Sequence, residues 1–134
     1  MGILLIRHGE TDGNKLRVVQ HPEVPLNENG LAQADRLGRR VEGVGITRIL
    51  ASDLARAHMT AAAVSRATGI DIELEPLLQE RDLGDLRGHA YASFDFDPMG
   101  LDYTPPAGES WPVFHQRVEA AWKRVAAVYR EVEG

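Results

Sequence analysis

The sequence predicts an α/β fold in which a mostly parallel sheet is flanked by helices. Three observations support this prediction. The run Ile3-Leu4-Leu5-Ile6 has the continuous hydrophobicity of a strand buried on both faces, as parallel sheets require. Strand-like and helix-like stretches then alternate along the chain. The last stretch is a long amphipathic helix, and helices that alternate with strands pack on the faces of such a sheet.

The first half of the chain supplies two strands with a helix between them. The strand at residues 3–6 comes first. Asn27 is in the position of a cap for a helix over residues 28–42, whose apolar positions share one face: Leu31, Ala34, Gly38 and Val41. Gly43 and Gly45 then end the helix, and residues 47–51 read as a short second strand.

The second half contains two more helices, a strand and a long loop. Ser52 or Asp53 is expected to cap an Ala-rich helix that ends at Thr68. Apolar and acidic residues alternate over 70–75, which predicts a strand with one wet face. Residues 76–109 lack periodicity and hold four Gly and four Pro, so we expect a loop. Apolar residues then recur at steps of three and four from Trp111 to Val132, behind Ser110 as a cap.

Length and composition indicate one globular domain over residues 1–134 and exclude several classes of protein. With 15 Lys and Arg against 20 Asp and Glu, the net charge is -5, so we expect neither nucleic acid nor a membrane as a partner. The chain has no cysteine, which rules out disulfides and thiolate chemistry. No segment is long enough to span a bilayer, and the apolar run at 3–6 is too short for a signal peptide. We therefore expect a soluble, cytoplasmic protein.

The segment Arg7-His8-Gly9 follows the first predicted strand, at the sheet edge where ligands of open α/β sheets bind. A neutral imidazole can attack phosphorus, an Arg can grip phosphate oxygens, and Gly lets the backbone approach closely. The simpler alternative is a His that only ends the strand. The spacing from Gly9 to Lys15 does not fit a P-loop. No second ligand cluster accompanies His8, Glu10 and Asp12, so we expect no metal site.

Five stretches of the chain together resemble the histidine phosphatase superfamily, in the branch that includes phosphoglycerate mutases. In chain order they are Ile6-Arg7-His8-Gly9-Glu10-Thr11 and the segments 25–34, 51–60, 78–88 and 106–110. The resemblance covers nearly the whole chain. It implies a three-layer αβα fold of the phosphoglycerate mutase type.

The resemblance also implies a role for each matching residue. His8 would be the nucleophile that forms a phosphohistidine, and Glu80 the general acid and later the base. Arg7, Arg56 and Asn14 would bind the phosphoryl oxygens, with no cofactor. A carboxylic acid near a buried anion would have a raised pKa, which suits an acid. Without the resemblance, Arg56 reads as surface charge, Asn14 as a turn residue and Glu80 as a solvated loop carboxylate.

One departure bears on activity. Members of the family carry a second catalytic His on a strand after the long helix, and none of the five His residues here matches it. The domain is therefore expected to be incomplete at its C-terminal side, with an open sheet edge that favours a homodimer. The chain is then a fragment, a short form completed by a partner copy, or a phosphate-binding module without turnover. We expect a phosphomonoester hydrolase that acts on a small phosphorylated metabolite and binds inorganic phosphate. Phosphoryl transfer of the mutase type and a non-catalytic module are the alternatives.

Overall fold

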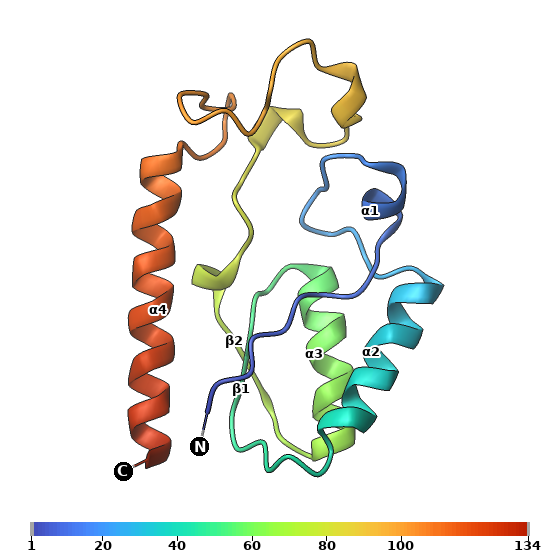
Figure 1. Ribbon diagram of the computed structural model, residues 1–134, viewed down its shortest axis with the longest axis vertical. Helices are drawn as coiled ribbons and strands as arrows, with labels where there is room; N and C mark the ends of the chain where they lie inside the picture. Colours follow the sequence, from blue (N-terminus) through green and yellow to red (C-terminus); the bar gives the residue numbers. More distant parts are fainter. Residues whose placement is uncertain (1, 134) are drawn as a thin grey trace.

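The computed structural model describes residues 2–133 and follows the predicted order of helices and strands from residue 28 onward, but it differs from the prediction at the start of the chain (Figure 1). Its main elements are α1 (Asp12–Leu16), α2 (Glu28–Val41), β1 (Ile49–Ala51), α3 (Ala55–Thr68), β2 (Ile72–Leu74) and α4 (Trp111–Glu133). Three short 3-10 helices interrupt the long loop: η1 (Pro76–Leu78), η2 (Gly84–Leu86) and η3 (Tyr91–Ser93). The short helix α1 was not expected from the sequence.

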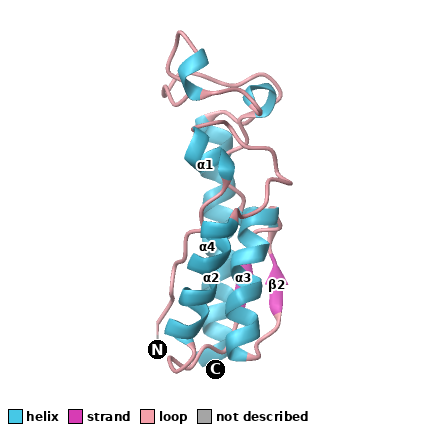
Figure 2. Cartoon of the chain, turned by 90° about the vertical axis from the view of Figure 1, so that its right-hand side faces the viewer, coloured by secondary structure: helices cyan, strands magenta, loops and turns pink. Residues whose placement is uncertain are grey.

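The fold is an α/β arrangement with a parallel sheet flanked by helices, as predicted. Strands β1 and β2 are parallel, with Ile49 opposite Ile72 and Ala51 opposite Leu74. Helix α3 forms the crossover between them. In Figure 1, α2 and α3 lie on one side of the strands and α4 on the other, and Figure 2 shows α2, α3 and α4 running along the same axis.

The prediction of a buried strand at residues 3–6 is wrong for this structure. None of these residues belongs to a strand, and Leu5 is 97% exposed. The physical reason is the lack of a pairing partner: within residues 2–133, β1 bonds only to β2. An apolar run without a neighbouring strand can neither satisfy its backbone groups in a ladder nor bury its side chains. Self-association of the chain stays a prediction.

Helices α2 and α3 pack closely because small residues line their contact. Asn27 caps α2 as predicted, since its side-chain oxygen accepts from the backbone N–H of Gly30 at 2.8 Å. A Cβ at Gly38 would lie 2.8 Å from the carbonyl oxygen of Ala63, so glycine permits the approach. Helix α3 starts later than predicted: Leu54 is its N-cap, while Ser52 Oγ accepts from the backbone N–H of Leu54 at 3.2 Å.

Helix α4 is fixed to the sheet by charged side chains. Arg48 bonds Glu73 through two nitrogens, at 2.6 and 2.7 Å, and Glu131 of α4 at 3.0 Å. Arg124 of α4 reaches Glu73 and Glu75. The predicted cap is confirmed, because Ser110 Oγ accepts from Val113 N–H at 3.2 Å. None of the helices described in residues 2–133 combines the length and apolarity needed to cross a membrane.

Candidate active site

The site begins with the loop that carries His8, which is held against the start of α2 by direct backbone contact. A Cβ at Gly9 would lie 2.7 Å from the carbonyl oxygen of Gly30. Glycine at both positions therefore lets the two backbones touch. The amide of Gly9 also donates to Thr60 Oγ1 of α3 at 3.0 Å. The loop is thus fixed by two helices, which sets the position of the imidazole.

The His8 ring is oriented by its own loop. Nδ1 lies 2.7 Å from the carbonyl oxygen of Gly9, so Nδ1 donates its hydrogen there. This contact directs Nε2 away from the loop, toward Glu80, whose Oε1 is 3.1 Å away. The side chain of His8 is only 11% exposed. Of the two ring nitrogens, Nε2 is the one available for chemistry.

Arg56 is a buried residue on the first turn of α3, so the alternative interpretation of Arg56 as ordinary surface charge is wrong. Its side chain is 4% exposed. Nε donates to Glu80 Oε1 at 2.9 Å, and Nη1 donates to the carbonyl oxygen of His21 at 2.9 Å. Thr60, one turn later, donates to the carbonyl oxygen of Arg56 at 2.8 Å and accepts from Gly9. Helix α3 therefore positions both the Arg and the His8 loop.

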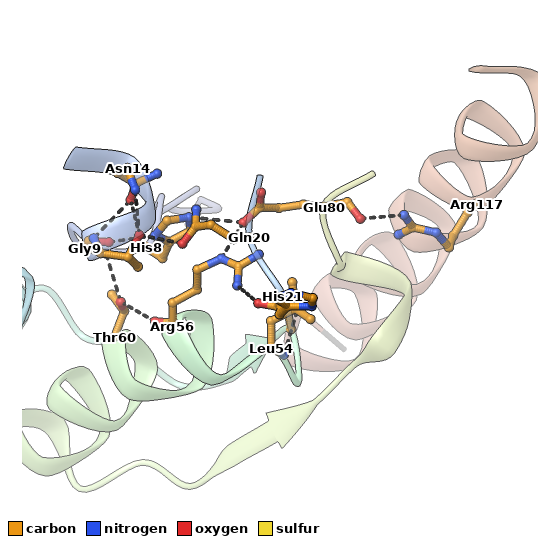
Figure 3. Close-up of polar contacts among 12 residues, drawn as sticks. His8, Gly9, Asn14, Gln20, His21, Leu54, Arg56, Thr60, Glu80 and Arg117 are labelled. Atoms are coloured by element: carbon orange, nitrogen blue, oxygen red, sulfur yellow. Dashed lines mark hydrogen bonds and ion pairs between the residues drawn. The ribbon is translucent and has the colours of Figure 1, made fainter. Parts of the chain in front are cut away.

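Glu80 lies between His8 and Arg56, and Figure 3 shows its carboxylate turned toward both side chains. A single oxygen, Oε1, contacts His8 and Arg56. The hydrogen bond from His8 lowers the pKa of Glu80 to about 2, helped by Arg56 and opposed by burial. The sequence-based expectation was a raised pKa. The direction differs because the expectation assumed a neighbouring anion, whereas here the carboxylate accepts hydrogen bonds from His8 and Arg56.

Asn14 and Arg7 differ in how they are held. Asn14 completes the capping box of α1: its Oδ1 accepts from the backbone N–H of Thr11 at 3.1 Å, and its own N–H donates to Thr11 Oγ1. This turn role commits the amide oxygen and leaves Nδ2 as a donor. Arg7 is exposed and forms no hydrogen bond or ion pair with the residues described. Of the five predicted site residues, the structure thus brings His8, Arg56 and Glu80 into contact.

A small cavity of about 50 Å³ adjoins the cluster. Arg56 and Glu80 line it on one side, and Gln20, Arg87 and Tyr91 are among its other walls. The wall is held by pairing of residues 17–19 with residues 88–91: Gly88 N–H donates to the carbonyl oxygen of Val19 at 2.7 Å, and Val18 forms an antiparallel bridge with Ala90. Burial raises the pKa of Tyr91, and the charge of Glu80 adds to this shift.

Sequence reasoning missed two residues that support the cluster, Thr60 and Arg117. Thr60 follows Arg56 by four positions, which places both on one face of a helix. Arg117 falls in the buried stripe of α4, between Phe114 and Ala121, and a cation at such a position is the signal that could have revealed it. Among residues 2–133, no three His, Asp or Glu side chains are grouped so as to hold a metal ion.

The α/β fold and the contact of His8, Arg56 and Glu80 define a domain of the histidine phosphatase and phosphoglycerate mutase class. The chain belongs to the histidine phosphatase superfamily (branch 1), whose sequence model matches residues 3–133.

Curated relatives and solved structures agree with this assignment. The chain is 35% identical over 129 residues to a "Probable phosphoglycerate mutase GpmB" of Proteus mirabilis, covering 89% of this chain and 60% of that protein. It superposes on the mycobacterial glucosyl-3-phosphoglycerate phosphatase in complex with VO3 with a TM-score of 0.80, at 29% identity, covering 91% and 63% of the two chains. It superposes on a phosphoglycerate mutase of Thermus thermophilus with a TM-score of 0.66, at 31% identity, covering 87% of this chain and 68% of that one. The chain thus spans about 60% of the length of the curated relatives it matches.

Proposed function

We propose that this chain carries the nucleophile and the acid of a phosphomonoester hydrolase that acts through a phosphohistidine at His8. The observation that carries the proposal is the convergence of His8, Arg56 and Glu80 from three separate segments, with 3.1 and 2.9 Å contacts on one carboxylate oxygen. Phosphoryl transfer needs chiefly positioning and charge stabilisation, and this cluster supplies both without a metal.

The reaction has two steps. His8 Nε2 attacks phosphorus, the bond from phosphorus to the ester oxygen breaks, and protonated Glu80 gives its proton to the leaving oxygen. Water then attacks the phosphohistidine, Glu80 takes a proton from it, the P–N bond breaks, and orthophosphate leaves. Arg56, Arg7 and Asn14 Nδ2 donate hydrogen bonds to the equatorial oxygens.

Substrate binding prepares Glu80 for the first step. The carboxylate of Glu80 contacts His8 and Arg56, the two side chains that the phosphoryl group of a substrate would contact in this mechanism. A phosphate dianion displaces the carboxylate, because two anions cannot share these donors at low cost. The displaced carboxylate then has an anion as its neighbour, which raises its pKa and favours the protonated form. A small phosphorylated metabolite or inorganic phosphate is the expected ligand.

Steady-state turnover of an aryl phosphate tests the proposal. We expect orthophosphate release by the wild-type chain and none by the His8→Ala variant. A relative named as a phosphoglycerate mutase favours a second candidate, transfer of the phosphoryl group between hydroxyls of a small acid. Product analysis distinguishes the two, because a mutase yields an isomer and no free phosphate. Saturable vanadate binding without turnover would instead identify a non-catalytic phosphate-binding module.

A further inference from the structure

We propose that Arg117, on α4, is a positioning residue that holds the Glu80 backbone so that the carboxylate reaches His8. This inference rests on the proposed function, because it concerns the acid of that reaction. Arg117 comes from a helix that supplies no other part of the cluster. Figure 3 shows its guanidinium directed at the main chain of Glu80, on the side away from His8.

The guanidinium of Arg117 binds three carbonyl oxygens of the segment that leads to the acid. Nη1 donates to Leu77 at 3.0 Å and to Gln79 at 2.7 Å, and Nη2 donates to Glu80 at 3.0 Å. The side chain is 18% exposed, so water competes weakly for these bonds. Residues 79–83 lie between η1 and η2, outside any strand or helix. Arg117 therefore supplies hydrogen bonds that regular secondary structure supplies elsewhere.

Glu109 links Arg117 to the residues that follow Glu80 in the chain. Its carboxylate pairs with Arg117 through two bonds, from Nε at 2.8 Å and from Nη2 at 2.7 Å. It also accepts from the backbone N–H of Asp82 at 2.8 Å, while its own N–H donates to the carbonyl oxygen of Asp82. The main chain is thus fixed immediately before and after Glu80.

Fixing the main chain matters because the Glu80 side chain is half exposed and has few constraints of its own. Among residues 2–133, its carboxylate is held only through Oε1, by His8 and Arg56. A general acid must lie within hydrogen-bond reach of the atom it protonates, and a shift of about 1 Å costs on the order of 100-fold in rate. Arg117 touches the backbone and not the carboxylate, so it acts on the chemistry through Glu80. A lysine has one nitrogen in place of the planar fork and cannot make this set of bonds.

The test compares two esters with different demands for an acid, in Arg117→Met and Arg117→Lys. A dinitrophenyl phosphate has a leaving group that departs without a proton, whereas glycerol phosphate needs one. We compare kcat/KM, which reports only the transfer of the phosphoryl group to His8 and not the later hydrolysis in which Glu80 acts as the base. We expect kcat/KM for glycerol phosphate to fall about 100-fold in Arg117→Met, and kcat/KM for the dinitrophenyl ester to change by less than about threefold. Glu80→Gln should show the same pattern, and the double variant should be no slower than Glu80→Gln alone.

Arg124→Met is the matched control, since Arg124 lies on the same helix and pairs with Glu73 and Glu75 instead of the acid segment. It should leave both rates unchanged. An equal loss on the two esters in folded Arg117→Met, or no loss at all, would overturn the proposal. If Arg117→Met does not unfold cooperatively, the same rates are measured for Arg117→Lys, for which we expect the same selective loss.

A second measurement needs no turnover. Carbon-13 NMR titration of the Glu80 carboxyl should give a pKa of about 2 in the wild-type chain. In Arg117→Met the pKa should move toward the ordinary value of 4.5, because the carboxylate leaves its two donors. An unchanged pKa in the folded variant would overturn the positioning role. A wild-type chain that hydrolyses neither ester would contradict the proposed function alone, and the titration would still decide the role of Arg117.

Discussion

The carboxylate of Glu80 lies 3.1 Å from Nε2 of His8, the ring nitrogen that its own loop leaves available. The same oxygen accepts from Arg56 Nε at 2.9 Å. The proposed acid is thus held by the proposed nucleophile and by the arginine proposed to bind phosphate. In the proposed mechanism an oxyanion that binds His8 and Arg56 displaces this carboxylate, so Glu80 would act first as a competitor and then as a proton donor.

This competition predicts the effect of Glu80→Gln on anion binding. Removing the negative charge leaves His8 and Arg56 free to bind vanadate, so we expect calorimetry to show tighter vanadate binding. Because the variant delivers no proton to the leaving group, we expect kcat to fall at least about 100-fold. Asp53→Asn is the control, since Asp53 accepts a hydrogen bond from Gln79 and contacts neither His8 nor Arg56 among the residues described. Weaker vanadate binding by Glu80→Gln would contradict the competition.

The same contacts predict how stability depends on pH. The pKa of Glu80 is about 2 in the folded protein and 4.5 for the ordinary group. Because the pKa is lower in the folded protein, the ionised carboxylate contributes its full stabilisation above about pH 4.5, and this contribution is lost as the pH falls toward 2. The free energy of unfolding, measured in urea across this range, should therefore decline more steeply for the wild-type chain than for Glu80→Gln. Glu73 and Glu109 also have lowered pKa values, but they affect both proteins alike. Parallel curves would contradict the assignment.

Arg56 should be far more sensitive to substitution than other cations of α3. Arg56→Met removes a buried donor aimed at the site, for which we expect kcat to fall about 100- to 1,000-fold. Arg66→Met is the matched control, because Arg66 is 66% exposed and its ion pair with Asp35 spans 3.5 Å. Its loss should change stability by less than about 1 kcal/mol and leave turnover intact. Similar rates for the two variants would show that Arg56 does not bind the phosphoryl group.

The close approach of Gly9 to α2 predicts a large effect from one methyl group. A Cβ at Gly9 would lie 2.7 Å from the carbonyl oxygen of Gly30, so Gly9→Ala must push the His8 loop away from the helix. We expect a loss of about 1–3 kcal/mol in the free energy of unfolding. Gly43→Ala is the control, because nothing lies within 4 Å of a Cβ at that position. Equal stabilities of the two variants would contradict this account of the loop.

Most helices were predictable from the sequence because their signals are local. The Asn27 cap, the apolar face of α2 and the periodicity of α4 each lie within one segment. The predicted strand at residues 3–6 failed because a strand depends on a neighbour, and no neighbour pairs with it among residues 2–133. Family resemblance indicated His8, Arg56 and Glu80, but not the direction of the Glu80 pKa shift, which depends on the hydrogen bonds that His8 and Arg56 make to the carboxylate.

Thr60 and Arg117 show what local patterns leave out. Both support the cluster through the backbone of distant segments: Thr60 through Gly9, and Arg117 through Leu77, Gln79 and Glu80. Such contacts follow from the packing of helices that are far apart in sequence. Neither residue belongs to a motif whose chemistry could be read from its neighbours.

The most direct test of the central claim is to trap the intermediate. The chain would be mixed with an aryl phosphate, quenched under alkaline conditions that preserve phosphohistidine, and digested for mass spectrometry. We predict one phosphoryl group on His8, lost on acid treatment and absent from the His8→Ala variant. Orthophosphate release by His8→Ala at the wild-type rate, or labelling of any other residue in its place, would contradict the account.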